Sequence, residues 1–117
     1  MFDKPLYLHE RLLAYTINRE FYRIARVIVK QMPRGNANLS DQLIRSSRTS
    51  CLAIAEGANS RSERMKRVFF ERAVSSNGES SACLDQVEDD GAAPLELITQ
   101  ARSLLHRASR LTLGLMR

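Results

Sequence analysis

Residues 9–32 read HERLLAYTINREFYRIARVIVKQM, and apolar side chains recur along them at steps of three or four. This spacing places the apolar side chains on one face of an α-helix. The face consists of Leu13, Ile17, Phe21, Ile24, Ile28 and Met32. Pro33 and Gly35 follow and end the helical pattern. The stretch therefore predicts an amphipathic helix over about 9–32, whose apolar face has to pack against other helices.

A second helix is predicted over about 39–56. Asn38 or Ser40 can cap its beginning, and Gly57 stands where a left-handed C-terminal cap is favoured. Its interior is rich in small side chains, namely Ser46, Ser47, Thr49, Ser50, Cys51 and Ala53. We therefore expect larger side chains of a neighbouring helix to pack against it.

A third helix is predicted over about 61–90, where Ser60-Arg61-Ser62-Glu63 has the pattern of a capping box. Its core-facing positions alternate steps of four and three, and they are Phe69, Ala73, Ser76, Ser80, Cys83 and Val87. Its middle is small and polar, and Gly78 there costs about 1 kcal/mol relative to alanine. Tertiary packing has to compensate for this weak helix propensity.

The register between the second and third helices depends on the turn between them, which we expect near Asn59. Counting outwards from this turn places Ser50 close to Phe69. The same count places Ser46 close to Ala73. Small residues would thus face larger ones across the helix pair.

A fourth helix is predicted over about 94–115, since Gly91 ends the preceding helix and Pro94 suits a first helical position. Its apolar series is Leu97, Ala101, Leu104, Ala108, Leu111 and Leu115. The connections between the four segments are short, so successive helices should be antiparallel neighbours. The sequence therefore predicts an all-α protein, a single antiparallel up-down-up-down four-helix bundle over residues 1–117.

Composition restricts the kinds of partner. The net charge of +5 favours an acidic partner such as nucleic acid or anionic lipid. Arginine greatly outnumbers lysine, which suits bidentate phosphate contacts and is equally consistent with a GC-rich genome. Cys51 and Cys83 are too few for a disulfide scaffold, and the predicted bundle places them well apart, so we expect both to be reduced.

The start of the chain bears on its compartment. Asp3, Lys4 and Pro5 interrupt any apolar stretch there, so no secretory signal pattern is visible. No run in the chain approaches the ~18 apolar residues of a membrane span. We therefore expect a cytoplasmic protein that does not enter a membrane.

Residues 42–57, QLIRSSRTSCLAIAEG, carry a longer pattern. They resemble the motif Q-I-R-R-A-A-x-S-I-P-A-N-I-A-E-G of the four-helix bundle proteins encoded in intervening sequences of bacterial 23S rRNA genes. Cys51 replaces the proline of that motif, and Ala53 replaces its asparagine. Residues 69–79 are similar to the family's F-L-x-x-A-x-x-S-x-x-E, and 101–105 fit its last helix. The likeness covers nearly the whole chain.

The resemblance implies a homopentameric ring of bundles. It also implies kinship with the accessory protein of diversity-generating retroelements, which partners a reverse transcriptase and binds nucleic acid. The partners expected on this ground are further copies of the chain, RNA or DNA, and a reverse transcriptase or other protein.

Four cations of the first predicted helix recur at steps of four, three and four, on the side opposite its apolar face. We call them the basic stripe, and they are Arg19, Arg23, Arg26 and Lys30. Two interpretations remain open, a stripe that follows phosphates or a solvated face with one sign of charge. No acidic residue stands within the stripe.

Tyr15, Tyr22 and Val29 lie seven residues apart, beside the basic stripe. They form the candidate oligomer interface, because tyrosine is enriched where protomers meet. The edge of the core and a surface on which bases stack are the alternatives.

Other charged groups are weighed against simple solvation. Arg45, Arg48, Arg61, Arg64, Lys66 and Arg67 surround the junction of the second and third helices, where solvated surface is the favoured interpretation. Asp85, Glu88, Asp89 and Asp90 could bind a cation, pair with another subunit's arginines or face solvent. Glu56 and Glu79 are expected to be partly buried among serines and structural. His9 and His106 are interpreted as isolated surface histidines.

No phosphate loop, nucleophile elbow or metal-ligand spacing is present in the sequence, so no catalytic site, metal or cofactor is expected. The leading hypothesis is a non-catalytic homo-oligomeric accessory protein that associates with nucleic acid or a nucleic-acid enzyme. The alternative is a self-associating scaffold or protein-interaction module without nucleic-acid affinity.

Overall fold

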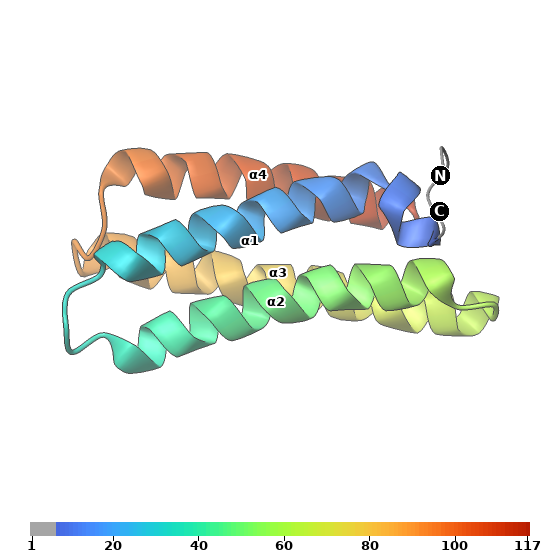
Figure 1. Ribbon diagram of the computed structural model, residues 1–117, viewed down its shortest axis with the longest axis horizontal. Helices are drawn as coiled ribbons and strands as arrows, with labels where there is room; N and C mark the ends of the chain where they lie inside the picture. The colour runs from blue at the N-terminus through green and yellow to red at the C-terminus, as the bar shows by residue number, and fades with distance from the viewer. Residues whose placement is uncertain (1–6) are drawn as a thin grey trace, which may run out of the picture.

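The computed structural model describes residues 7–117, which form four long helices and one short 3-10 turn (Figure 1). The elements are η1 (Leu8–Arg11), α1 (Leu13–Gln31), α2 (Ala37–Asn59), α3 (Glu63–Asp89) and α4 (Leu95–Gly114). No strand occurs among the described residues, and the predicted all-α four-helix bundle is confirmed. Residues 1–6 lie outside the described part of the chain, and with them the prediction made on Asp3, Lys4 and Pro5.

The helices follow one another around the bundle. α1 packs against α2 and α4, α3 packs against the same two helices, and the α2–α3 contact is the most extensive. Figure 1 shows α4 and α1 as neighbours in the upper part of the view and α2 and α3 in the lower part. No described helix combines the length and the apolar character that crossing a membrane requires.

The N-terminal caps of α2 and α3 both differ from the prediction. α2 begins at Ala37 with Asn36 as its N-cap, so neither Asn38 nor Ser40 caps it. α3 is capped by Ser62, whose hydroxyl accepts a hydrogen bond from the Met65 amide at 3.2 Å. The predicted cap, Ser60, lies two residues too early. Serine is a favoured N-cap at either position, and only the path of the chain selects one.

The end of α3 agrees with the prediction at Gly91. Its φ of 60° is left-handed. The Ala92 amide donates to the Val87 carbonyl at 2.9 Å, and the Gly91 amide donates to the Glu88 carbonyl at 3.0 Å. These two bonds form a Schellman motif, which satisfies the last carbonyls of the helix. α4 then begins at Leu95, directly after Pro94.

Gly57 is not a C-terminal cap, and that prediction was wrong. α2 continues through Gly57 to Asn59, and the glycine is buried against Phe70 of α3. A Cβ atom at position 57 would lie 2.6 Å from Cε1 of Phe70, closer than packed atoms approach. The absence of a side chain therefore lets the two helices meet at this level.

The register of α2 against α3 also differs from the expected one. The Ser46 and Ser80 hydroxyls lie 2.6 Å apart, whereas Ala73 was the expected neighbour of Ser46. The Ser50 hydroxyl lies 3.2 Å from the carbonyl oxygen of Ala73, where Phe69 was expected. Because α2 extends past Gly57, the turn lies further along the chain and every partner on α3 moves with it.

The main hydrophobic core occupies the half of the bundle that holds the α1–α2 and α3–α4 loops. Its large members come from all four helices, and they include Phe21, Ile28, Leu43, Leu84, Val87, Ile98 and Leu105. A smaller cluster at the other end contains Ala53, Ile54, Phe70 and Ala73. Cys51 and Cys83 are both buried and free.

A hydrogen-bonded network of buried polar side chains lies between these clusters. The Asn77 amide of α3 donates to Oδ1 of Asn18 on α1 at 2.9 Å. The Ser50 hydroxyl of α2 lies 2.9 Å from the same oxygen, and Nδ2 of Asn18 donates to Sγ of Cys51 at 3.5 Å. Asn18 is 0% exposed and Asn77 is 1% exposed. A single side chain of α1 is thus held by both α2 and α3.

We predict opposite effects for alanine at two helical glycines. Gly57→Ala places a methyl group against the Phe70 ring and should lower the free energy of unfolding by about 1–3 kcal/mol. At Gly78 a Cβ atom meets nothing within 4 Å, so Gly78→Ala should raise stability by roughly 0.5–1 kcal/mol. Urea unfolding measures both. A Gly57→Ala variant that is as stable as Gly78→Ala would show that the α2–α3 contact is not tight.

We predict strong coupling between Asn18 and Asn77. Asn18→Leu leaves the buried Asn77 amide without its acceptor and should cost about 1–3 kcal/mol. Asn18→Leu combined with Asn77→Leu removes both partners, so the double variant should regain part of the loss. Additive losses in denaturant unfolding would contradict a shared network.

Candidate nucleic-acid interface

The basic stripe lies on the solvent side of α1. Arg19, Arg23, Arg26 and Lys30 are all exposed. The buried positions of the same helix lie on its other side, and they are Ala14, Ile17, Asn18, Phe21, Ala25 and Ile28. From Arg19 to Lys30 the stripe rises by eleven residue steps, or roughly 16 Å at 1.5 Å per step.

Two exposed arginines of α2, Arg45 and Arg48, widen the stripe into a two-helix surface. Arg48 Nη2 donates a hydrogen bond to the Tyr22 hydroxyl at 3.0 Å. The guanidinium carbon of Arg48 lies 5.8 Å from the centre of the Tyr22 ring, and that of Arg26 lies 5.9 Å from it. These distances are within the range of cation–π attraction, so Tyr22 holds one cation from each helix. We call this surface of α1 and α2 the α1/α2 face.

No cation of the α1/α2 face forms an ion pair within 4.0 Å with a carboxylate of residues 7–117. Among the described residues, the ion pairs within 4.0 Å join Arg102 of α4 to two carboxylates of α3, Asp85 at 2.8 Å and Glu88 at 2.6 Å. Asp41 is the carboxylate nearest to Arg45 along α2, and it forms no such pair. The positive charge of the face is therefore available to an anionic partner.

The basic residues around the α2–α3 junction have different local roles. Lys66 Nζ donates to the carbonyl oxygens of Gly57 at 3.4 Å and Ala58 at 3.1 Å, which caps the end of α2. Arg67 Nη2 donates to the carbonyl oxygen of Met116 at 3.2 Å. Arg61 and Arg64 are exposed, as solvated surface would be.

The candidate interface residues are half-buried within the subunit. Tyr15 packs on the smaller core cluster and makes an edge contact with the His9 ring, 4.7 Å between centroids. Val29 packs on the main core. Tyr22 is engaged by two arginines, as described above. Their role in contacts between subunits stays a prediction.

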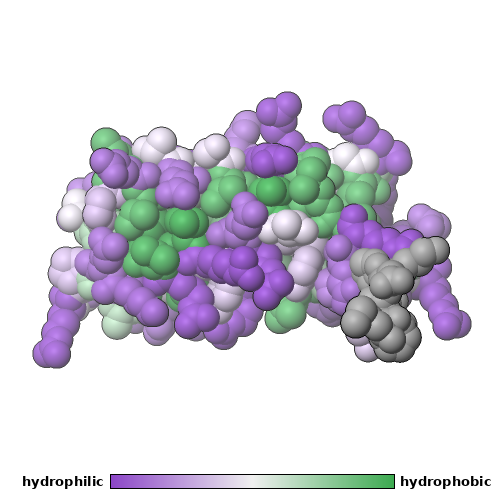
Figure 2. All heavy atoms as spheres, turned by 45° about the horizontal axis from the view of Figure 1, so that its top comes forward, coloured by the Kyte–Doolittle hydropathy of each residue, from purple (hydrophilic) through white to green (hydrophobic). Residues whose placement is uncertain are grey.

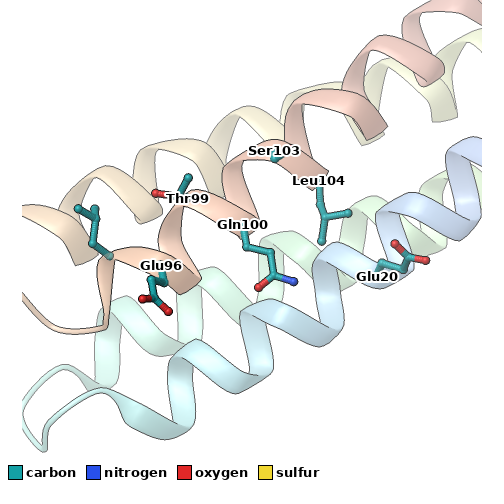
Figure 3. A pocket seen from close by; sticks show the side chains of 7 residues that line it. Glu20, Glu96, Thr99, Gln100, Ser103 and Leu104 are labelled. Carbon is teal, nitrogen blue, oxygen red and sulfur yellow. The ribbon is translucent and has the colours of Figure 1, made fainter.

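Exposed apolar side chains gather instead beside α4. Figure 2 shows hydrophobic side chains in a broken band along the face that carries α4 and α1. Leu13 and Val27 are exposed, and each lies seven residues from Glu20, so all three share one side of α1. Glu20 lines a groove of about 650 Å³ with Leu104 and other side chains of α4. Figure 3 shows Gln100 and Leu104 directed from α4 towards α1, where Glu20 lies. We call this feature the α1/α4 groove.

Two carboxylates expected to be partly buried are not. Glu56 and Glu79 are both exposed, because each points to the outer side of its helix, whereas the next residues, Gly57 and Ser80, are buried. No described group of three or more His, Cys, Asp or Glu side chains is placed to hold a metal ion. Asp85 and Glu88 do pair with an arginine, but it is Arg102 of the same subunit.

The histidines differ from one another. His9 was interpreted as an isolated surface residue, but its ring stacks with Tyr7, and its Nδ1 lies 2.8 Å from Nδ2 of Asn59. It therefore helps to hold η1 on the end of α2. His106 is exposed on α4.

The buried thiols are poor nucleophiles in this fold. Burial raises the pKa of Cys51, although its contact with Asn18 and the charge of Arg19 act in the opposite direction. Burial also raises the pKa of Cys83, and the nearby charge of Glu79 adds to the effect. Both groups stay protonated at neutral pH, which is the unreactive form of cysteine.

Comparison with known proteins gives no family assignment. No protein-family model matches this chain, and no curated protein matches it.

Proposed function

We propose that this protein is a non-catalytic, self-associating accessory bundle that binds RNA or DNA through its α1/α2 face. The observation that carries the proposal is the set of six exposed cations on two adjacent helices, none of which has a carboxylate within 4.0 Å in the described part of the chain. They are Arg19, Arg23, Arg26, Lys30, Arg45 and Arg48. An unpaired basic surface of this kind attracts phosphates by releasing the counterions condensed on them.

The size of the basic stripe suits a nucleic-acid backbone. Its roughly 16 Å correspond to about five phosphates of one strand at 3.4 Å per phosphate along a DNA helix. Contacts to phosphates position the nucleic acid without reading its sequence. The proposed binding is therefore largely sequence-independent and strongly dependent on salt.

Self-association strengthens this binding. The resemblance of residues 42–57 to the intervening-sequence proteins suggests a ring of five copies, and a closed ring joins two different surfaces of each subunit. Such a ring repeats the α1/α2 face on every copy, so weak contacts add through avidity. The same resemblance suggests a reverse transcriptase or a related nucleic-acid enzyme as protein partner.

We predict that glutamine at all four stripe positions removes most nucleic-acid binding. Glutamine is a good helix former, so the fold should survive while four charges are lost. If all four residues contact phosphates, the slope of log affinity against log salt should fall by about 3. Fluorescence anisotropy with labelled RNA and DNA between about 50 and 200 mM salt measures both quantities.

The matched control replaces by glutamine four exposed arginines that lie outside α1 and α2. These are Arg72 of α3, Arg107 and Arg110 of α4, and Arg117, which follows α4. It changes the net charge by the same amount, so it should retain most of the affinity if the α1/α2 face binds. If the two variants lose equal amounts of affinity, the effect of the stripe substitutions is due to net charge alone. An absence of binding by the wild-type protein at about 50 mM salt would reject the nucleic-acid function.

The α1/α4 groove favours a second candidate function, a self-associating scaffold without nucleic-acid affinity. Apolar side chains at and beside this groove are exposed to water. A second copy of the chain that packed there would cover them. In the proposed function the same groove joins the copies while the α1/α2 face stays free for nucleic acid.

We predict that Val27→Gln weakens self-association and that Val68→Gln does not. The two valines are equally exposed, at 40% and 39%, but only Val27 lies beside the α1/α4 groove. Light scattering at micromolar concentration measures the mass of each variant. Loss of assembly in Tyr15→Gln but not in Val27→Gln would instead support the interface predicted at Tyr15, Tyr22 and Val29. A wild-type monomer would reject both.

A further inference from the structure

The α1/α2 face contains a shallow hollow of about 320 Å³, which we call the α2 hollow. Three aliphatic side chains contribute to its lining, Val29 from α1 and Ile44 and Leu52 from α2. Leu52 is 56% exposed, so much of its side chain is open to a ligand. The volume is at the lower end of the range for small-molecule sites, which begins at about 300 Å³.

Charged groups of both signs surround this apolar surface, and cations outnumber carboxylates there. Arg45 and Arg48 line the α2 hollow, and Arg48 is held in place by its hydrogen bond to Tyr22. Asp41 lines it as well. A carboxylate at this position repels a phosphate from the hollow, while the two arginines attract phosphates to its edge. A neutral, flat, largely apolar group flanked by phosphates fits this distribution of charge.

We infer that the α2 hollow receives an unpaired base of single-stranded nucleic acid. The inference rests on the proposed function and specifies its ligand. A base within a duplex is stacked and paired, so it cannot enter a hollow on a convex helix surface, whereas bases of a single strand can turn outward. Arg48 and Arg26 against the Tyr22 ring present further flat surfaces on which a neighbouring base can stack.

Three probes of equal length separate this inference from simple phosphate binding. They are a 12-nucleotide single-stranded RNA, the same strand with abasic sites at its centre, and the corresponding duplex. Anisotropy at about 50 mM salt should show the intact single strand binding about tenfold more tightly than the abasic strand, which is the size expected for one well-placed base. The duplex should also bind more weakly than the single strand.

A matched pair of variants locates the effect. Leu52→Glu places a charge in the α2 hollow, and Val68→Glu places the same charge on α3, where the valine is 39% exposed and lines neither the α2 hollow nor the α1/α4 groove. Leu52→Glu should lose the preference for the intact strand over the abasic strand, and Val68→Glu should keep it. Circular dichroism confirms that both are folded.

Three outcomes would overturn the inference. If the wild-type protein binds all three probes equally, phosphate binding stands, but no base enters the α2 hollow. If Leu52→Glu still prefers the intact strand to the abasic strand, the base binds at a different site. If the wild-type protein binds none of the three probes, both the proposed nucleic-acid function and this inference are wrong.

Discussion

The hydrogen bonds of Asn18 set the orientation of α1 within the bundle. Its Oδ1 accepts from Asn77 on α3, the Ser50 hydroxyl of α2 lies 2.9 Å from it, and the side chain is fully buried. A buried amide is costly without partners, so rotations of α1 that break these bonds are disfavoured. Because Asn18 points inward, Arg19 and its neighbours at helical spacing point outward. The position of the basic stripe thus depends on a buried polar contact.

The close approach of α2 and α3 supports this network. Gly57 has no side chain, and the Phe70 ring occupies the space beside it. Further along the same pair, the Ser46 and Ser80 hydroxyls meet at 2.6 Å. Small residues bring the two helices together, and their hydroxyl groups then satisfy one another inside the bundle. The polar middle of α3, weak in helix propensity, is stabilised by these tertiary contacts.

The bundle separates its two kinds of surface. Tyr22 draws Arg26 and Arg48 together on the α1/α2 side. Exposed apolar side chains, Val27 among them, lie on the opposite side of α1 beside α4. A helix with a charged side and an apolar side can contact an anionic partner and another protein at the same time. This arrangement suits an assembly in which contacts between copies leave the basic surface open.

The number, type and order of the helices follow from the sequence, because helical periodicity and breakers such as Pro33 and Gly91 act locally. The outward position of the basic stripe was also predictable, since it is opposite the apolar face of one helix. Three other features could not be predicted from the sequence: the tight contact at Gly57, the register of α2 against α3, and the exposure of Glu56. These features depend on the axial offset and rotation of each helix, which are decided only when all four helices pack together.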